Sequence, residues 1–77
     1  MSITVKYFAS LAEDLGRRED RVPAGDAATV ADAWRAANGD RDLPPNVLSA
    51  VNHEYVDSGH AVRDGDEVAF FPPVTGG

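Results

Sequence analysis

The chain has 77 residues, with thirteen aspartate and glutamate residues against seven lysine and arginine residues, for a net charge of −6 at pH 7. Its length and its hydrophobic fraction of 43% are typical of one small soluble domain, and the lack of cysteine suits a reducing compartment such as the cytoplasm. The negative charge argues against nucleic acid as a partner, and neither a signal-peptide pattern nor an apolar run near the ~20 residues that span a bilayer is present.

The first predicted element is a strand over residues 3–8, because its side chains alternate between an apolar and a mixed face. The face predicted to be buried carries Ile3, Val5 and Tyr7. Leu11 and Leu15 follow four residues apart, directly before Gly16. This spacing predicts one or two helical turns that end at the glycine and turn both leucines toward the core.

An edge strand and the main helix are predicted next. Residues 17–25 are polar apart from Val22 and end in a Pro-Ala-Gly turn, a pattern tolerated at the edge of a sheet. The clearest helix begins after Thr29, which can cap it with Asp32 as an acidic capping-box partner, and ends at residues 38–39. Its apolar stripe is Val30, Ala33, Trp34 and Ala37. The tryptophan is expected to be a core anchor rather than a functional residue.

Three further strands complete the predicted sheet. They cover residues 47–51, 55–56 and 67–71, with turns at 52–54 and 64–66. The last strand has four apolar residues in a row, which suits a central strand covered on both faces. We therefore predict an α+β fold of the β-grasp type, with a mixed sheet wrapped around one main helix in a domain of residues 1–71. The hydrophobic first and last strands would lie side by side in its middle.

No independent active site is expected in this sequence. It has no cysteine nucleophile, no glycine-rich phosphate loop and no histidine pair at metal-binding spacing. His53 and His60 lie seven residues apart in predicted loops, so they are expected on the surface and not around a metal. No directly bound cofactor is expected either.

The end of the sequence, residues 72–77, is predicted to be a flexible, extended tail. Two prolines stop strand pairing and favour a polyproline-like exit, and six residues can reach roughly 20 Å. The tail consists of Pro72, Pro73, Val74, Thr75, Gly76 and Gly77. A terminal carboxylate is activated only inside an enzyme that brings it to ATP, and two glycines let the backbone enter a narrow channel. The activated carboxylate can then pass to sulfur or to an amine.

Side-chain alternation also places two aromatic residues together. Phe8 falls on the strand face opposite the predicted core set, and Phe71 falls on the face opposite Val68 and Phe70. If the first and last strands are neighbours, Phe8 and Phe71 form an apolar patch at the root of the tail. Exposed aromatic pairs of this kind mark interfaces more often than they occur on monomer surfaces.

The run from Asp64 to Gly77 closely resembles the end of the small, sulfur-carrying subunit of molybdopterin synthase, in the ubiquitin-like family. Upstream, residues 50–52 before a short turn, and residues 7–9 before a leucine-containing helix, fit the same family. The resemblance covers the whole chain in order and spacing, and its C-terminal motif is the specific part.

The resemblance implies a β-grasp fold and a role as sulfur carrier. A ubiquitin-activating-like adenylyltransferase would use ATP to adenylate the Gly77 carboxylate, and a sulfur donor would convert it to a thiocarboxylate. The tail would then enter the large synthase subunit, where sulfur passes to cyclic pyranopterin monophosphate. Residues at the positions of Phe8, Tyr55 and Phe71 contribute to partner surfaces in this family, although an aliphatic residue is common in place of Tyr55. The family also implies a complex of two small and two large subunits.

Other functions stay open from the sequence alone. A sulfur carrier for thiamine synthesis shares the fold and the Gly-Gly end, but such carriers usually lack the Phe-Phe-Pro-Pro run. A ubiquitin-like protein modifier would join the same activated carboxylate to lysines, and an interaction module with an inert tail is a third class. The acidity serves either solubility alone or the steering of basic partner proteins.

Overall fold

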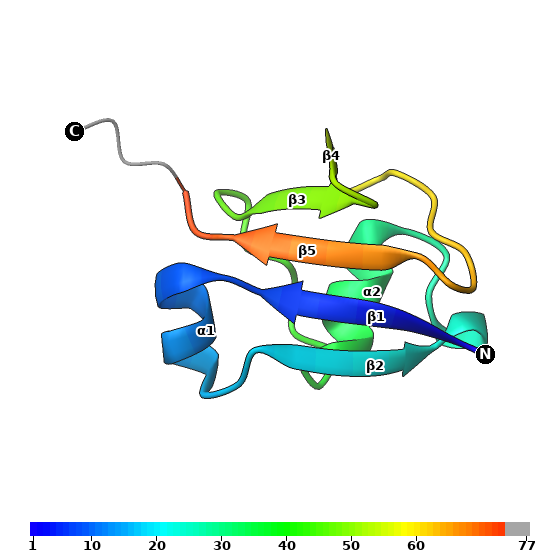
Figure 1. Cartoon of the computed structure of the whole chain (residues 1–77), viewed down its shortest axis with the longest axis horizontal. Helices are drawn as coiled ribbons and strands as arrows, with labels where there is room; N and C mark the ends of the chain where they lie inside the picture. The colour runs from blue at the N-terminus through cyan, green and yellow to red at the C-terminus, as the bar shows by residue number, and fades with distance from the viewer. Residues whose placement is uncertain (74–77) are drawn as a thin grey trace.

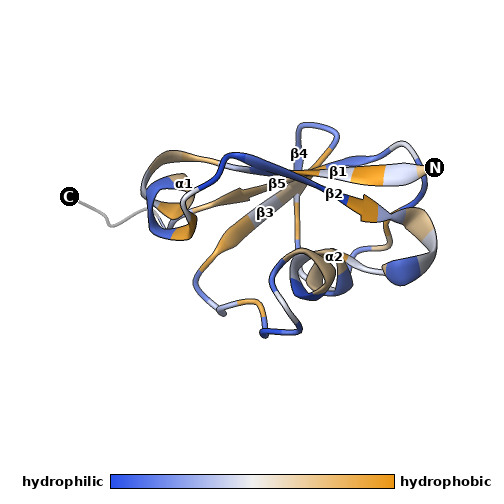
Figure 2. Cartoon of the chain, turned by 90° about the horizontal axis from the view of Figure 1, so that it is seen from below, coloured by the Kyte–Doolittle hydropathy of each residue, from blue (hydrophilic) through white to orange (hydrophobic). Residues whose placement is uncertain are grey.

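The computed structural model describes residues 1–73 and joins their strands in one mixed sheet (Figure 1). In chain order the elements are β1 (Ser2–Tyr7), α1 (Ala9–Leu15), β2 (Glu19–Pro23), the short 3-10 helix η1 (Ala24–Asp26), α2 (Val30–Ala37), β3 (Leu48–Val51), β4 (Glu54–Val56) and β5 (Glu67–Phe71). The strands lie in the order β2-β1-β5-β3-β4, with β1 and β5 parallel and all other neighbours antiparallel. Helix α2 lies across one face of this sheet (Figure 2). The predicted β-grasp arrangement is therefore confirmed.

The two central strands follow the predicted patterns. Along β1 the side chains alternate between buried and half-buried, with Ile3, Val5 and Tyr7 on the inner face. Strand β5 lies between β1 and β3, and its residues 68–70 are all buried. A strand paired on both sides and covered by side chains on both faces needs this apolar run. The predicted pairing of the first and last strands is confirmed.

Helix α1 ends, and helix α2 begins and ends, where the sequence predicts. Helix α1 ends at Gly16, whose φ of 74° is a left-handed conformation that glycine adopts without strain. Helix α2 begins with a capping box: the Asp32 N–H donates to Thr29 Oγ1 at 3.3 Å, and the Thr29 N–H donates to Asp32 Oδ2 at 3.2 Å. The Ala28 N–H also donates to this carboxylate, at 3.1 Å. These backbone hydrogen bonds, that of Ala28 first, lower the pKa of Asp32.

The core centres on an aromatic cluster between α2 and the sheet. Trp34 packs edge-on against Phe70, with ring centroids 5.0 Å apart, and against Tyr7 at 5.9 Å. All three rings are at most 4% exposed. The expectation that Trp34 is a core anchor is confirmed.

Arg17 ties the sheet to the end of α2, a contact that local sequence patterns do not indicate. Its guanidinium donates to Asp20, to the Ala37 carbonyl at 2.9 Å and to Asn38 Oδ1 at 2.6 Å, and lies 5.3 Å from the centre of the Tyr7 ring. The Tyr7 hydroxyl in turn donates to Asp20 at 2.9 Å. Burial, reinforced by this carboxylate, raises the pKa of Tyr7.

Several predicted boundaries differ from the structure. The strand predicted over residues 3–8 covers Ser2–Tyr7, and the edge strand predicted over residues 17–25 covers Glu19–Pro23 and is followed by η1. The strand predicted over residues 47–51 begins at Leu48, because the Val47 N–H donates to the Pro44 carbonyl in a turn instead of joining the sheet. The turn predicted over residues 52–54 contains only Asn52 and His53, whose φ values of 49° and 72° make a tight two-residue hairpin. Asn52 suits this place because its side chain bonds both Asp66 and the Glu67 N–H, each at 3.0 Å.

Candidate partner-docking face and tail root

The face of the sheet away from α2 gathers the aromatic residues that the sequence singles out. The register of the strands determines which residues share this face. Between β3 and β5, Leu48 lies opposite Phe71 and Ala50 lies opposite Ala69; between β3 and β4, Ala50 lies opposite Tyr55. Residues opposite one another share a face, so three neighbouring strands contribute to one surface. We call Phe8, Leu48, Tyr55 and Phe71, with Ala50 and Ala69 between them, the docking patch.

Phe8 and Phe71 form the centre of the docking patch. Their rings are stacked with centroids 4.9 Å apart and planes 12° apart. Phe8 follows the last residue of β1 in an extended conformation and donates its N–H to the Phe70 carbonyl at 3.1 Å, so it continues the parallel pairing by one residue. This confirms the predicted contact between the two rings.

Tyr55 and Leu48 extend the docking patch toward the sheet edge. The Tyr55 ring lies 5.8 Å from that of Phe71 and is 74% exposed, while Leu48 is 38% exposed and Phe8 41%. Ala50 and Ala69 lie between these larger side chains and are buried. Their small side chains leave room for the aromatic rings. Large apolar side chains left this exposed on adjacent strands are typical of a protein interface.

An ion pair borders the docking patch on the side of β1. Lys6 Nζ lies 3.2 Å from Glu67 Oε1, across the parallel pair, and His53 Nε2 lies 3.9 Å from the other oxygen of this carboxylate. Lys6 is the one lysine of the sequence. Exposed pairs of this kind contribute little stability, on the order of 0–1 kcal/mol, but they give the rim of an interface its charge pattern.

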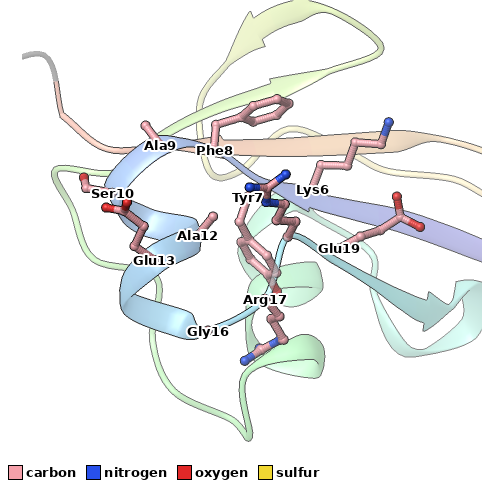
Figure 3. A pocket seen from close by; sticks show the side chains of 11 residues that line it. Lys6, Tyr7, Phe8, Ala9, Ser10, Ala12, Glu13, Gly16, Arg17 and Glu19 are labelled. Carbon is pink, nitrogen blue, oxygen red and sulfur yellow. The ribbon is translucent and has the colours of Figure 1, made fainter.

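An open hollow of about 980 Å³ adjoins the docking patch where β1 runs into α1. Figure 3 shows Phe8 and Lys6 on one side of β1 and the Tyr7 ring on the other. The charged residues lining the hollow are Lys6, Arg17 and Arg18 on the basic side and Glu13 and Glu19 on the acidic side. Because both signs are mixed in the lining, the hollow does not present a field of one sign to an ionic ligand.

Strand pairing ends at Phe71, as the prolines predict. Pro72 is half-buried and Pro73 is exposed, and neither belongs to a strand. The predicted reactive end, Val74, Thr75, Gly76 and Gly77, lies outside the described residues. What the structure contributes is the place from which the tail begins: directly beside the stacked Phe8 and Phe71 rings.

The described residues present no other arrangement with obvious chemistry. Within residues 1–73 no three histidine, cysteine, aspartate or glutamate side chains gather as metal ligands would. No helix in this part of the chain is long and apolar enough to cross a membrane. His53 and His60, predicted on the surface, are both exposed.

Leu48 is the large docking-patch residue that the sequence analysis does not single out. The signal was available, because the alternation that places Phe71 on the outer face also places Leu48 and Ala50 together on one face of their strand. Without the register between β3 and β5, however, alternation does not say which face is the outer one.

Comparisons with known proteins agree with this geometry. A model of the ThiS family matches residues 5–77. The chain is 42% identical to the molybdopterin synthase sulfur carrier subunit of Escherichia coli K12, over 97% of this chain and 99% of that protein. It is 39% identical to small archaeal modifier protein 1 of Haloferax volcanii, over 94% and 97%. The crystal structure of SAMP1 from Haloferax volcanii matches it with a TM-score of 0.82 at 37% identity, with both chains fully covered.

Proposed function

Because the chain belongs to the ThiS family, we propose that it is the sulfur carrier subunit of a molybdopterin synthase. The observation that carries the proposal is the position of the docking patch. Its stacked Phe8 and Phe71 rings lie where β5 ends and the Pro72–Gly77 tail begins. A partner that covers the patch is thereby placed to receive the tail. The 42% identity to the Escherichia coli sulfur carrier subunit, over 97% of this chain, supports this role.

The chemistry of the proposal belongs to the Gly77 carboxylate. Inside an adenylyltransferase related to ubiquitin-activating enzymes, a carboxylate oxygen attacks the α-phosphate of ATP and pyrophosphate leaves. Hydrosulfide supplied by the sulfur donor then attacks the acyl carbon, AMP leaves and a proton is lost, so the terminus becomes a thiocarboxylate. The ATP site lies on that partner, so this chain needs no cofactor of its own.

Delivery of the sulfur takes place in the large synthase subunit. The docking patch, with Phe8, Tyr55 and Phe71 as anchors, binds that subunit, and the tail carries the thiocarboxylate to cyclic pyranopterin monophosphate. Binding energy from the patch offsets the entropy lost when the tail is held in place. In the cytoplasm the complex contains two small and two large subunits.

Reconstitution tests this proposal directly. The chain is incubated with the adenylyltransferase, ATP and sulfide, and its intact mass is measured before the large subunit and cyclic pyranopterin monophosphate are added. We expect the mass to rise by the difference between sulfur and oxygen, and molybdopterin to form in proportion to the modified chain. An unmodified mass, or a modified chain that yields no molybdopterin, would show that the proposal is wrong.

One observation favours a second function, that of a protein modifier. The chain is 39% identical to a protein named small archaeal modifier protein 1. In this role the adenylated Gly77 carbonyl is attacked by a lysine amine, AMP leaves and an amide bond forms. Repeating the activation step with ATP in a cell extract distinguishes the two functions, because a modifier becomes attached to other proteins and a dedicated sulfur carrier does not.

A further inference from the structure

A second apolar concavity lies beside the docking patch, on the edge of the sheet formed by β3 and β4. It is a groove of about 630 Å³ whose walls include Leu43, Pro44, Pro45, Val47, Leu48 and Tyr55. Among the residues described, Asp57 is the one charged side chain in its lining. We call it the edge groove.

The edge groove is built into the fold. Three of its lining residues, Leu43, Val47 and Val56, are partly buried and pack against the hydrophobic core. The two prolines restrict the backbone of the loop before β3, and the hydrogen bond from the Val47 N–H to the Pro44 carbonyl, 3.1 Å long, closes a turn there. A concave surface held in this way loses little conformational entropy when it binds a partner.

The edge groove and the docking patch form one continuous apolar surface. Leu48 and Tyr55 belong to both, and Leu48 lies opposite Phe71 in the sheet. The start of β3 therefore lies beside the end of β5, as Figure 1 also shows. A protein that binds the docking patch beside Phe71 would therefore lie next to this wall of the groove.

We propose that the edge groove is the second half of the surface that binds the large synthase subunit. This inference rests on the proposed function. It extends the surface that contacts the large subunit beyond the anchors Phe8, Tyr55 and Phe71. The occupant is an apolar side chain of that subunit with a basic residue close to it in space. The apolar walls favour the apolar side chain, and the Asp57 carboxylate at the rim favours the basic residue.

The test fills the groove without touching the docking patch. Ser58 lines the groove and is exposed, and it contributes its backbone carbonyl, not its side chain, to the hydrogen bond with the Ala31 N–H. Ser58→Trp should therefore fold normally and raise the Kd for the large subunit by about tenfold or more in calorimetric titration. Ala36→Trp is the matched control, because Ala36 is exposed on α2, away from this face. The Kd of this variant for the large subunit should stay within about twofold of wild type.

A second variant tests the charge. The Asp57 side chain accepts the Gly59 N–H at 3.0 Å, and an asparagine oxygen can keep that hydrogen bond. Asp57→Asn should raise the Kd about threefold at low salt and reduce the dependence of binding on ionic strength. Neither the Kd nor its dependence on ionic strength would change if Asp57 served only the local turn.

The outcomes separate this inference from the function on which it rests. If wild type does not bind the large subunit, both are wrong. If wild type and both groove variants bind equally well, the proposed function stands and the edge groove is not part of the interface. If the chain alone forms a dimer in sedimentation that Ser58→Trp abolishes, the occupant is a second copy and the inference is overturned.

Discussion

Replacing Phe71 by alanine separates the two roles that an aromatic residue at the end of β5 can have. The neighbouring residue provides the matched control, since Phe70 is fully buried between α2 and the sheet whereas Phe71 lies on the outer face. Phe70→Ala removes the Trp34 contact at 5.0 Å and leaves a cavity, which usually costs ~3–5 kcal/mol. A domain with ~5–15 kcal/mol of stability loses a large part of it.

Phe71→Ala should cost much less. It removes the stack on Phe8 at 4.9 Å and the Tyr55 contact at 5.8 Å, and aromatic pairs of this kind contribute ~0.5–1.5 kcal/mol each. Since the ring is only half-buried, we expect a total loss of about 1–2 kcal/mol, which lowers the Tm by roughly 5–15 °C. As an interface anchor it should cost about 2 kcal/mol or more in binding, a rise of about 30-fold in Kd for the large subunit.

Two measurements on each variant check this reasoning. Calorimetry of the isolated chain gives the stability, and titration with the large subunit at a temperature where each variant is folded gives the affinity. We expect Phe70→Ala to lose mainly stability and Phe71→Ala mainly affinity. If Phe71→Ala melts as low as Phe70→Ala while its affinity per folded molecule is unchanged, Phe71 belongs to the core and the docking patch is not an interface.

Three further predictions concern the tail and the capping box. Removing Gly77, or adding one residue after it, should abolish sulfur transfer without changing the Tm. The reason is that a shift of ~3.3 Å misplaces the reactive carbon. Normal molybdopterin formation by either variant would contradict this prediction. Gly76→Val should fold normally but slow adenylation, measured by pyrophosphate exchange, since a branched side chain must enter a channel sized for bare backbone; a rate within about twofold of wild type counts against it. Asp32 has a lowered pKa, so its stabilising effect is complete above the ordinary carboxyl pKa of 3.8 and is lost as the pH falls through the lower folded value. The Tm difference between wild type and Asp32→Ala should therefore shrink from about pH 6 to about pH 2.5, and a constant difference would refute the charge-based explanation.

Much of the fold is predictable because local patterns here agree with the tertiary structure. The alternation in β1 and the stripe of α2 identify their buried faces, and Thr29 with Asp32 marks where α2 begins. Part of the candidate site follows as well. The Phe8–Phe71 stack is predictable from alternation alone once β1 and β5 are taken as neighbours.

No local sequence pattern predicts the edge groove or the Arg17 contacts. The loop over residues 40–47 lacks periodicity, and its shape depends on how Leu43 and Val47 pack against a core formed by distant strands. Arg17 contacts Asn38, which is 21 residues away, and nothing in either local sequence specifies that pairing. Contacts of this kind depend on the assembled topology rather than on propensity.

The central place of β5 also has a mechanical consequence. Its residues are bonded to β1 on one side and to β3 on the other, with the ladders running parallel to the strand. A force applied at Phe71 along β5 would therefore load both ladders in shear, so that many hydrogen bonds must break together instead of one after another. The body of the domain would therefore stay folded under a pull on the tail that breaks only a few contacts elsewhere. The same tail attached to an edge strand such as β4 would be held by one ladder instead of two, and the strand would slip from the sheet under a smaller load.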